Sequence, residues 1–242
     1  MNQGMFYGIG VGPGDPDLLT VKAVSVLATC PHVFVPKART GAESVALEIA
    51  HKYLRGDAQV QELVFPMTPD QALLEQRWRE SAEVIAPVLE AGKDACFLTL
   101  GDPMVYSTYI YLLRALAERL PGVKTMTIPG ITSFCAAAAA TQFALGEGKE
   151  LITIVPTSDD LTVLRSALAT QGTVVLMKIG KRLREIIKIL EESGLIEHSV
   201  FVSHIGLGHQ HIETDLRKLC VDDPEAGYLS VIIVHASRRS EK

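Results

Sequence analysis

The chain has 242 residues, of which 48% are hydrophobic and 21% charged, as expected of a globular protein that buries a core. The net charge of −5 argues against a protein held to nucleic acid by bulk electrostatics, although a local basic patch can still bind an anionic small molecule. No apolar run approaches the roughly 20 residues that span a bilayer, and residues 1–5 lack the pattern of a secretory signal, so we expect a cytoplasmic protein without a membrane partner.

Short apolar runs alternate with helical patterns through the first half of the chain. Strands are predicted at 6–11, 33–35, 61–65, 95–100 and 124–128, and helices at 17–28, 42–54, 70–91, 107–119 and 132–144. Asp70 can cap the helix at 70–91, and Pro87 is expected to kink or shorten it. This alternation predicts right-handed crossovers and a parallel sheet.

The second half of the chain has a different pattern. Strands are predicted at 151–155, 173–178 and 200–205, separated by helices. Runs at 211–216 and 228–235 then follow with no convincing helix between them, which indicates an antiparallel or mixed sheet. We therefore predict two α/β domains, an N-terminal domain over 1–130 and a C-terminal domain over 131–242.

The four cysteines are far apart and form no C-x-x-C pair, so neither a disulfide framework nor a zinc site is expected. Cys96 lies in an apolar run, which predicts a buried thiol. His204, His209, His211 and Glu213 cluster late in the chain and raise the alternative of a metal site. Contact of these side chains with a ligand edge or with solvent is the favoured interpretation.

Three glycine-bearing loops each follow a predicted strand of the first half. They are Gly8-Ile9-Gly10-Val11-Gly12-Pro13-Gly14-Asp15, the segment 100–108 that begins Leu100-Gly101-Asp102-Pro103, and Ile128-Pro129-Gly130-Ile131-Thr132-Ser133. The dinucleotide fingerprint fails, because Pro13 or Asp15 falls where the third glycine is needed, and no P-loop motif occurs. Open α/β sheets bind ligands at the carboxyl ends of their strands, so we expect the three loops to converge on one pocket.

In this order and spacing, the three loops, with Leu18-Leu19-Thr20 after the first, resemble the tetrapyrrole (class III) methyltransferases. The resemblance covers nearly the whole chain. It implies two α/β domains with S-adenosylmethionine in the cleft between them, a tetrapyrrole substrate and a homodimer. Many members continue the second loop with an aromatic residue and Gly-Arg or Gly-Thr, whereas this chain has Met104-Val105-Tyr106-Ser107-Thr108. That variant, together with 35–39, is similar to the branch that methylates carbon 20 of precorrin-2 or cobalt-precorrin-2 in cobalamin biosynthesis.

The resemblance also implies roles for individual residues. Cofactor contacts are expected at Pro13, Leu100, Gly101, Asp102, Val105, Thr132, Ser133, Met177, Gly206, Leu229 and Ser230. Because the substrate carries many carboxylates, we expect basic residues to bind it, namely Lys37, Arg39 and Lys178. Asp102, Tyr106 and His204 are candidates for the base that removes a proton after methyl transfer, although an enzyme that only orients its reactants is also possible. No protein-bound metal is expected.

Several alternatives remain open at this point. A same-fold methyltransferase can act on another tetrapyrrole intermediate, on a protein residue or on RNA, and a pigment- or nucleotide-binding regulator needs no catalysis. The glycine loop can be a tight turn without a ligand. Met177 can be a core residue, and Ser107, Thr132 or Ser133 can be helix caps.

Overall fold

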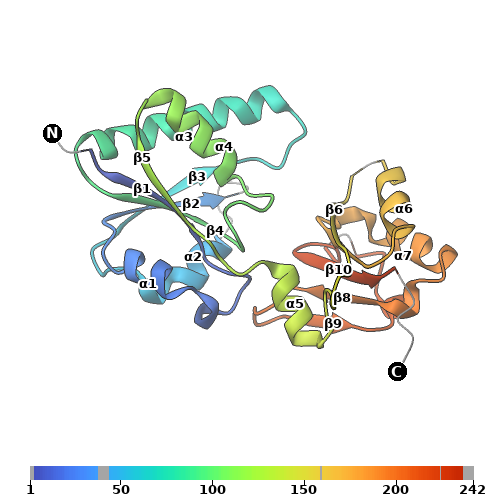
Figure 1. Cartoon of the computed structure of the whole chain (residues 1–242). Coiled ribbons are helices and arrows are strands. Elements are labelled where there is room, and N and C mark those ends of the chain that lie inside the picture. Colours follow the sequence, from blue (N-terminus) through green and yellow to red (C-terminus); the bar gives the residue numbers. More distant parts are fainter. Residues whose placement is uncertain (1–2, 38–43, 159, 224, 237–242) are drawn as a thin grey trace. The chain divides into compact units, whose positions relative to one another are not determined.

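A computed structural model describes residues 3–37, 44–158, 160–223 and 225–236. The chain divides into two compact units, Met1–Thr132 and Ser133–Lys242 (Figure 1), and each is described by itself. Among the described residues, no helix has both the length and the apolar character needed to cross a bilayer.

The first unit contains the predicted parallel sheet. Its strands are β1 (Met5–Gly10), β2 (His32–Lys37), β3 (Gln59–Val64), β4 (Ala95–Thr99) and β5 (Lys124–Ile128). The strand order is β3-β2-β4-β1-β5, and every neighbouring pair is parallel. Cys96 is fully buried in β4, as the apolar run predicts. The order places β4, β1 and β5 side by side, and these are the strands that precede the three glycine loops.

Helices cover both faces of this sheet, with α3 and α4 on one face and α1 and α2 on the other (Figure 1). The four helices are α1 (Val21–Leu27), α2 (Val45–Ala50), α3 (Gln71–Glu90) and α4 (Tyr109–Arg119). Phe6, Phe34 and Phe97 of the strands form a buried cluster with side chains of α3 and α4. Burial of these large side chains is the main contribution to the stability of this layer.

Helix ends differ from the predictions for identifiable local reasons. The predicted helix 17–28 is divided, because the Thr20 side chain caps a helix that begins only at Val21 and accepts a hydrogen bond from the Ala23 amide at 3.2 Å. Asp70 caps α3 as predicted. The expectation that Pro87 shortens this helix is wrong, because α3 continues to Glu90. Pro87 lies at the start of the last turn, so only residues 88–90 of the helix follow it.

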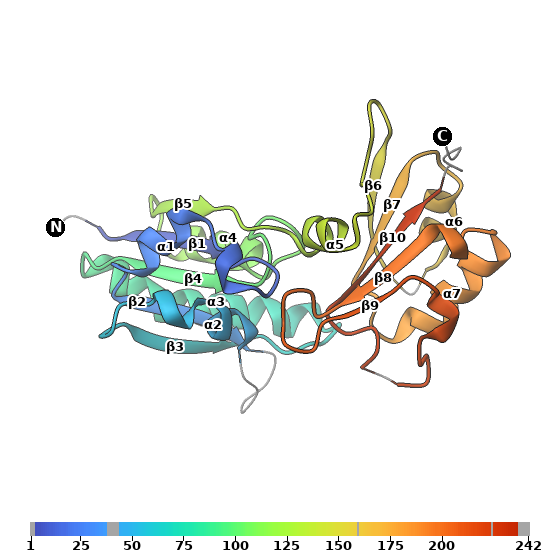
Figure 2. The same ribbon diagram turned by 90° about the horizontal axis from the view of Figure 1, so that it is seen from below.

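The second unit contains a mixed sheet, again as predicted. Its strands are β6 (Ile152–Pro156), β7 (Thr173–Met177), β8 (Ser199–Ser203), β9 (His211–Glu213) and β10 (Ser230–His235), in the order β6-β7-β10-β8-β9. Only β6 and β7 are parallel; the other pairs are antiparallel. Figure 2 shows α6 (Thr162–Leu168) and α7 (Leu183–Glu192) on one side of the sheet, where they complete its core, and α5 (Ser133–Thr141) on the other.

Candidate functional site

The first two glycine loops are joined by their main chains. Gly12 and Gly101 form an isolated antiparallel bridge. The Gly101 amide donates to the Gly12 carbonyl at 2.8 Å, and the Gly12 amide donates to the Gly101 carbonyl at 3.3 Å. Both glycines have φ above +70°, a conformation that side chains other than glycine rarely adopt. The loops that follow β1 and β4 therefore form one connected structure.

Asp102 connects the second loop to the third. Its Oδ1 accepts a hydrogen bond from the Met104 amide at 2.8 Å, and its Oδ2 accepts one from the Gly130 amide at 3.0 Å. Hydrogen bonds from amides to a carboxylate are charge-assisted and stronger than those between neutral groups. Asp102 thus fixes its own turn and holds it against the loop that follows β5.

Close contact between the three loops requires glycine at two positions. A Cβ atom on Gly10 would lie 2.6 Å from both the Gly101 carbonyl oxygen and the Gly130 nitrogen. A Cβ atom on Gly130 would lie 2.1 Å from the Gly101 oxygen. Around Gly101 itself, an added Cβ would meet nothing within 4 Å, so this glycine borders open space. The three loops therefore meet through their main chains, and the space beside Gly101 is open.

Buried hydroxyl groups close the base of the second loop. Thr99 Oγ1 and Ser107 Oγ are 2.9 Å apart, and Ser107 Oγ also accepts a hydrogen bond from the Tyr109 amide at 3.1 Å. The expectation that Ser107 is the N-cap is wrong, because Thr108 occupies that position of α4 without a side-chain cap bond, and the Ser107 hydroxyl instead bonds the Tyr109 amide from one residue earlier. Tyr106, just before it, has φ of +50° and is 42% exposed, so its ring is accessible on the surface of the loop.

Tyr109, the first residue of α4, packs against β1 and β5, the strands that precede the first and third loops. Sequence reasoning missed this role. Its ring occupies the space that a side chain at Gly8 would need, since a Cβ atom there would lie 2.1 Å from the ring. Its hydroxyl lies 2.9 Å from Thr127 Oγ1, and burial raises the pKa of this phenol. The glycine at position 8 was the available signal, because a glycine inside a strand often marks a close approach.

A second group of predicted residues lies at one end of the strands β7, β8 and β10 of the other sheet. Because β10 is antiparallel to β7 and β8, its first residues lie beside their last ones: Met177 pairs with Val231, and Ser203 pairs with Ser230. Six predicted residues lie at or just beyond these strand ends: Met177, Lys178, His204, Gly206, Leu229 and Ser230. Ser133 is elsewhere in the unit, as the first residue of α5.

Backbone strain is concentrated in the predicted loops. Five described residues other than glycine have positive φ, and four of them are predicted site residues: Tyr106, Lys178, His204 and Leu229. The His204 amide donates to the Leu229 carbonyl at 2.9 Å, which joins two of the strained positions. Such conformations cost energy and cluster at ligand-binding and catalytic sites. They therefore indicate a functional role for the loops that contain these four residues.

Gly180 and Gly227 are a second feature that the sequence did not reveal. The Gly180 amide donates to the Gly227 carbonyl at 3.0 Å, and the Ser230 hydroxyl donates to the same carbonyl at 2.7 Å. A Cβ atom on Gly227 would lie 2.0 Å from the Gly180 oxygen. These contacts join the loop after β7 to the turn before β10. They arise from tertiary packing and have no motif of their own.

The histidines that are close in sequence, His204, His209 and His211, do not form one cluster in the structure. The ring centroids of His204 and His209 are 4.1 Å apart, whereas His211 makes an edge contact with Phe201. Burial, and secondarily the neighbouring His209, lower the pKa of His204, while Glu225 has an opposing effect. Within the described ranges, no three His, Cys, Asp or Glu side chains are arranged to hold a metal ion.

The predicted substrate-binding cations have different surroundings. Lys37, at the end of β2, pairs with Glu62 of β3 at 2.6 Å, and its side chain is only 11% exposed. Lys178 is exposed, and its carbonyl accepts a hydrogen bond from the Thr157 hydroxyl at 2.5 Å. Arg39 lies outside the described residues. Lys37 is therefore already paired with a carboxylate of the neighbouring strand.

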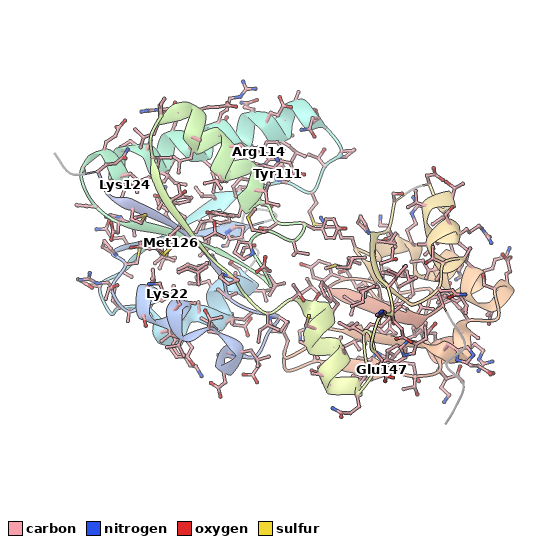
Figure 3. The ribbon with its side chains drawn as sticks, in the orientation of Figure 1. Lys22, Tyr111, Arg114, Lys124, Met126 and Glu147 are labelled. Atoms are coloured by element: carbon pink, nitrogen blue, oxygen red, sulfur yellow. The ribbon has the colours of Figure 1, made fainter. Side chains whose placement is uncertain are left out.

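A surface groove of about 370 Å³ is lined by side chains of α3 and α4. Trp78 and Tyr111 stack there with ring centroids 4.3 Å apart, and the Arg114 guanidinium lies 5.9 Å from the Tyr111 ring (Figure 3). Arg79 and Glu75 neutralise each other at 3.4 Å. Because side chains of two helices form this groove, without a loop from the sheet, we do not place the reaction there.

Comparison with known proteins identifies the family. The sequence model of the Tetrapyrrole (Corrin/Porphyrin) Methylases matches residues 5–220, which include the three glycine loops of the first unit. The chain belongs to this family.

Two relatives match along almost their whole length. The cobalt-precorrin-2 C(20)-methyltransferase of Salmonella typhimurium is 33% identical over 96% of this chain and 97% of its own. The precorrin-2 C(20)-methyltransferase of Sinorhizobium is 30% identical over 96% of this chain and 95% of its own.

Solved structures share the fold. The X-ray structure of a cobalt precorrin-4 methyltransferase matches with a TM-score of 0.75 and 21% identity, covering 95% of this chain and 94% of that chain. The uroporphyrin-III C-methyl transferase of Thermus thermophilus, complexed with S-adenyl homocysteine, matches with a TM-score of 0.64 and 23% identity over 96% and 97%.

Proposed function

We propose that this protein is an S-adenosylmethionine-dependent methyltransferase that methylates carbon 20 of precorrin-2, or of its cobalt complex, in cobalamin biosynthesis. The observation that carries the proposal is the end-to-end similarity to two relatives with this activity in their names, at 30% identity or more. The three converging loops agree with it, because they meet at the carboxyl ends of neighbouring parallel strands and the space beside Gly101 is open.

The residues present fit S-adenosylmethionine. In the first unit, we propose contacts from Pro13, Leu100, Gly101, Asp102, Val105 and Thr132. In the second, we propose contacts from Ser133, Met177, Gly206, Leu229 and Ser230. The open space beside Gly101 allows the close approach of a nucleoside, and the carboxylate of Asp102 provides negative charge for a cationic ligand. When bound, the cosubstrate supplies a methyl group that its sulfonium activates.

The chain accelerates the transfer mainly by positioning its reactants. In-line attack needs the accepting carbon about 3–3.5 Å from the methyl carbon, and rigid loops maintain such a geometry. Asp102 contributes to this rigidity, because both of its carboxylate oxygens are occupied by amides of the second and third loops. We propose that Asp102 acts chiefly in this way, and that Tyr106 contacts the reactants through its accessible ring.

The tetrapyrrole carboxylates need cationic partners. We propose Lys37, Arg39 and Lys178 for this role. Lys37 is already held at the end of β2 by Glu62, and a substrate carboxylate would compete with Glu62 for the same ammonium.

We further propose that the protein acts as a cytoplasmic homodimer and needs no protein-bound metal, nucleic-acid partner or membrane. The net charge of −5 supports the exclusion of nucleic acid. Analytical ultracentrifugation of the purified chain tests the dimer.

Methyl transfer itself is tested with S-adenosylmethionine that carries a ¹³C-methyl group. The protein is incubated with precorrin-2, and separately with cobalt-precorrin-2, and the product is examined by NMR. We expect the label on carbon 20, and the faster reaction identifies the preferred metal state. Label on another carbon, or on a protein or RNA, would support the same-fold alternatives. Cofactor binding with no transfer to either tetrapyrrole would favour a non-catalytic regulator.

A further inference from the structure

His204 and His209 form an imidazole pair just beyond the end of β8. Their ring centroids are 4.1 Å apart with the planes tilted by 47°, and the Tyr228 ring lies 6.0 Å from His204. His204 is partly buried, whereas His209 is exposed. The inner imidazole is therefore shielded by the outer one and by a tyrosine.

The main chain fixes the position of this pair. His204 directly follows β8 with φ of +51°, and its amide is bonded to the strained residue Leu229. The loop that carries His209 is closed by its own hydrogen bonds: the Leu207 amide donates to the His204 carbonyl at 2.9 Å, and the Gly206 amide donates to Gln210 Oε1 at 2.8 Å. A strained backbone that the surrounding bonds maintain is typical of functional residues.

The electrostatic surroundings favour a neutral imidazole. His209 acts on His204 from the same loop, and Tyr228 and Glu225 act from the turn before β10. Burial is the largest cause that lowers the pKa of His204, followed by His209, and Glu225 only partly opposes them. A neutral imidazole has one nitrogen free to accept a proton near neutral pH.

We infer that His204 is the catalytic base that takes the proton from the methylated meso carbon, and that His209 is a positioning residue for it. The inference rests on the proposed function. The carbon–methyl bond forms as the sulfur–methyl bond breaks, and that bonding pair stays on sulfur. The carbon–hydrogen bond then breaks, its electrons restore the conjugation of the macrocycle, and the proton passes to the imidazole nitrogen. Water later receives this proton.

His204→Asn is the central test variant. Asparagine tolerates positive φ, so the backbone can keep its conformation while the imidazole is removed. We expect kcat to fall about 10²- to 10⁴-fold, the range typical of general-base catalysis, with unchanged affinity for S-adenosylmethionine by calorimetry. His211→Gln, at an exposed histidine of the same unit, is the matched control and should retain wild-type activity.

Substrate carrying deuterium on the accepting carbon adds a readout that a purely structural role would not change. Because proton removal becomes slower in His204→Asn, the isotope effect on kcat should increase in that variant. Wild-type kcat should decline on the acid side only below the ordinary histidine value of about 6.5. His209→Gln should move this decline to higher pH, because the neighbouring positive charge is removed. His209→Lys should move it to lower pH.

The outcomes separate this inference from the proposed function. If the wild-type protein does not methylate precorrin-2 or its cobalt complex, the proposed function fails. If the wild type is active and His204→Asn retains kcat within threefold, the inference about His204 is wrong. If neither His209 variant shifts the acid-side decline of kcat, the inference that His209 is a positioning residue is wrong.

Discussion

Replacement of Gly130 by alanine is the sharpest perturbation of the loop cluster. The new Cβ atom would lie 2.1 Å from the Gly101 carbonyl oxygen, more than an ångström inside the 3.4 Å at which ordinary contact begins. Main-chain atoms of Gly10 also lie within 3 Å, so neither neighbouring loop can yield by rotating a side chain. The third loop must move away, and the bond between Asp102 and the Gly130 amide lengthens or breaks.

Overpacking of this kind costs about 1–3 kcal/mol of folding free energy. For a chain of this size, each kcal/mol lowers Tm by roughly 2–4 °C. The larger effect is expected on binding, because the displaced main chain belongs to the cofactor site. We expect the Kd for S-adenosylmethionine to rise at least about tenfold, which corresponds to ~1.4 kcal/mol.

Differential scanning fluorimetry and isothermal titration calorimetry measure the two effects. Gly56→Ala is the matched control, because a Cβ atom there meets nothing within 4 Å and the backbone has no positive φ. It should leave Kd unchanged and alter stability by less than about 1 kcal/mol, in the stabilising direction. Wild-type Tm and Kd in Gly130→Ala would refute the argument that the loops need glycine in order to meet.

Four further substitutions test individual contacts. Asp102→Asn keeps only one acceptor oxygen for two amides, so we expect a loss of about 1–3 kcal/mol in urea unfolding and weaker cofactor binding by calorimetry. Tyr109→Phe retains the ring over Gly8 but loses the bond to Thr127, which should cost about 0.5–1.5 kcal/mol by the same assay and leave kcat unchanged. Glu62→Gln releases Lys37, so KM for the tetrapyrrole should fall, whereas Lys37→Met should raise it; equal KM values in both variants would exclude Lys37 from the substrate site.

Much of the fold is encoded in local patterns. β5 begins and ends where the apolar run predicts, and the alternation of strands and helices correctly predicts a parallel sheet. Helix ends are less predictable, because one side chain can decide them. The Thr20 cap makes α1 begin later than the apolar pattern predicts, and α3 continues past Pro87 to Glu90.

The candidate site was predictable where glycines mark it. The three loops of the first unit follow a known pattern, so their convergence could be expected from the strand order. The bonds between Gly180 and Gly227 and the strained conformations of Lys178 and Leu229 could not be expected. These features depend on which strands become antiparallel neighbours, and no short segment of the sequence records that pairing.

Hydrogen exchange of backbone amides, measured with and without S-adenosylmethionine, tests most directly whether the three loops form the binding site. We predict that ligand slows exchange in segments 10–15, 99–106 and 128–132, and leaves the outer strand β3 unchanged. Saturating ligand that binds without protecting any of these three segments would contradict the site, and with it the mechanism built on its geometry.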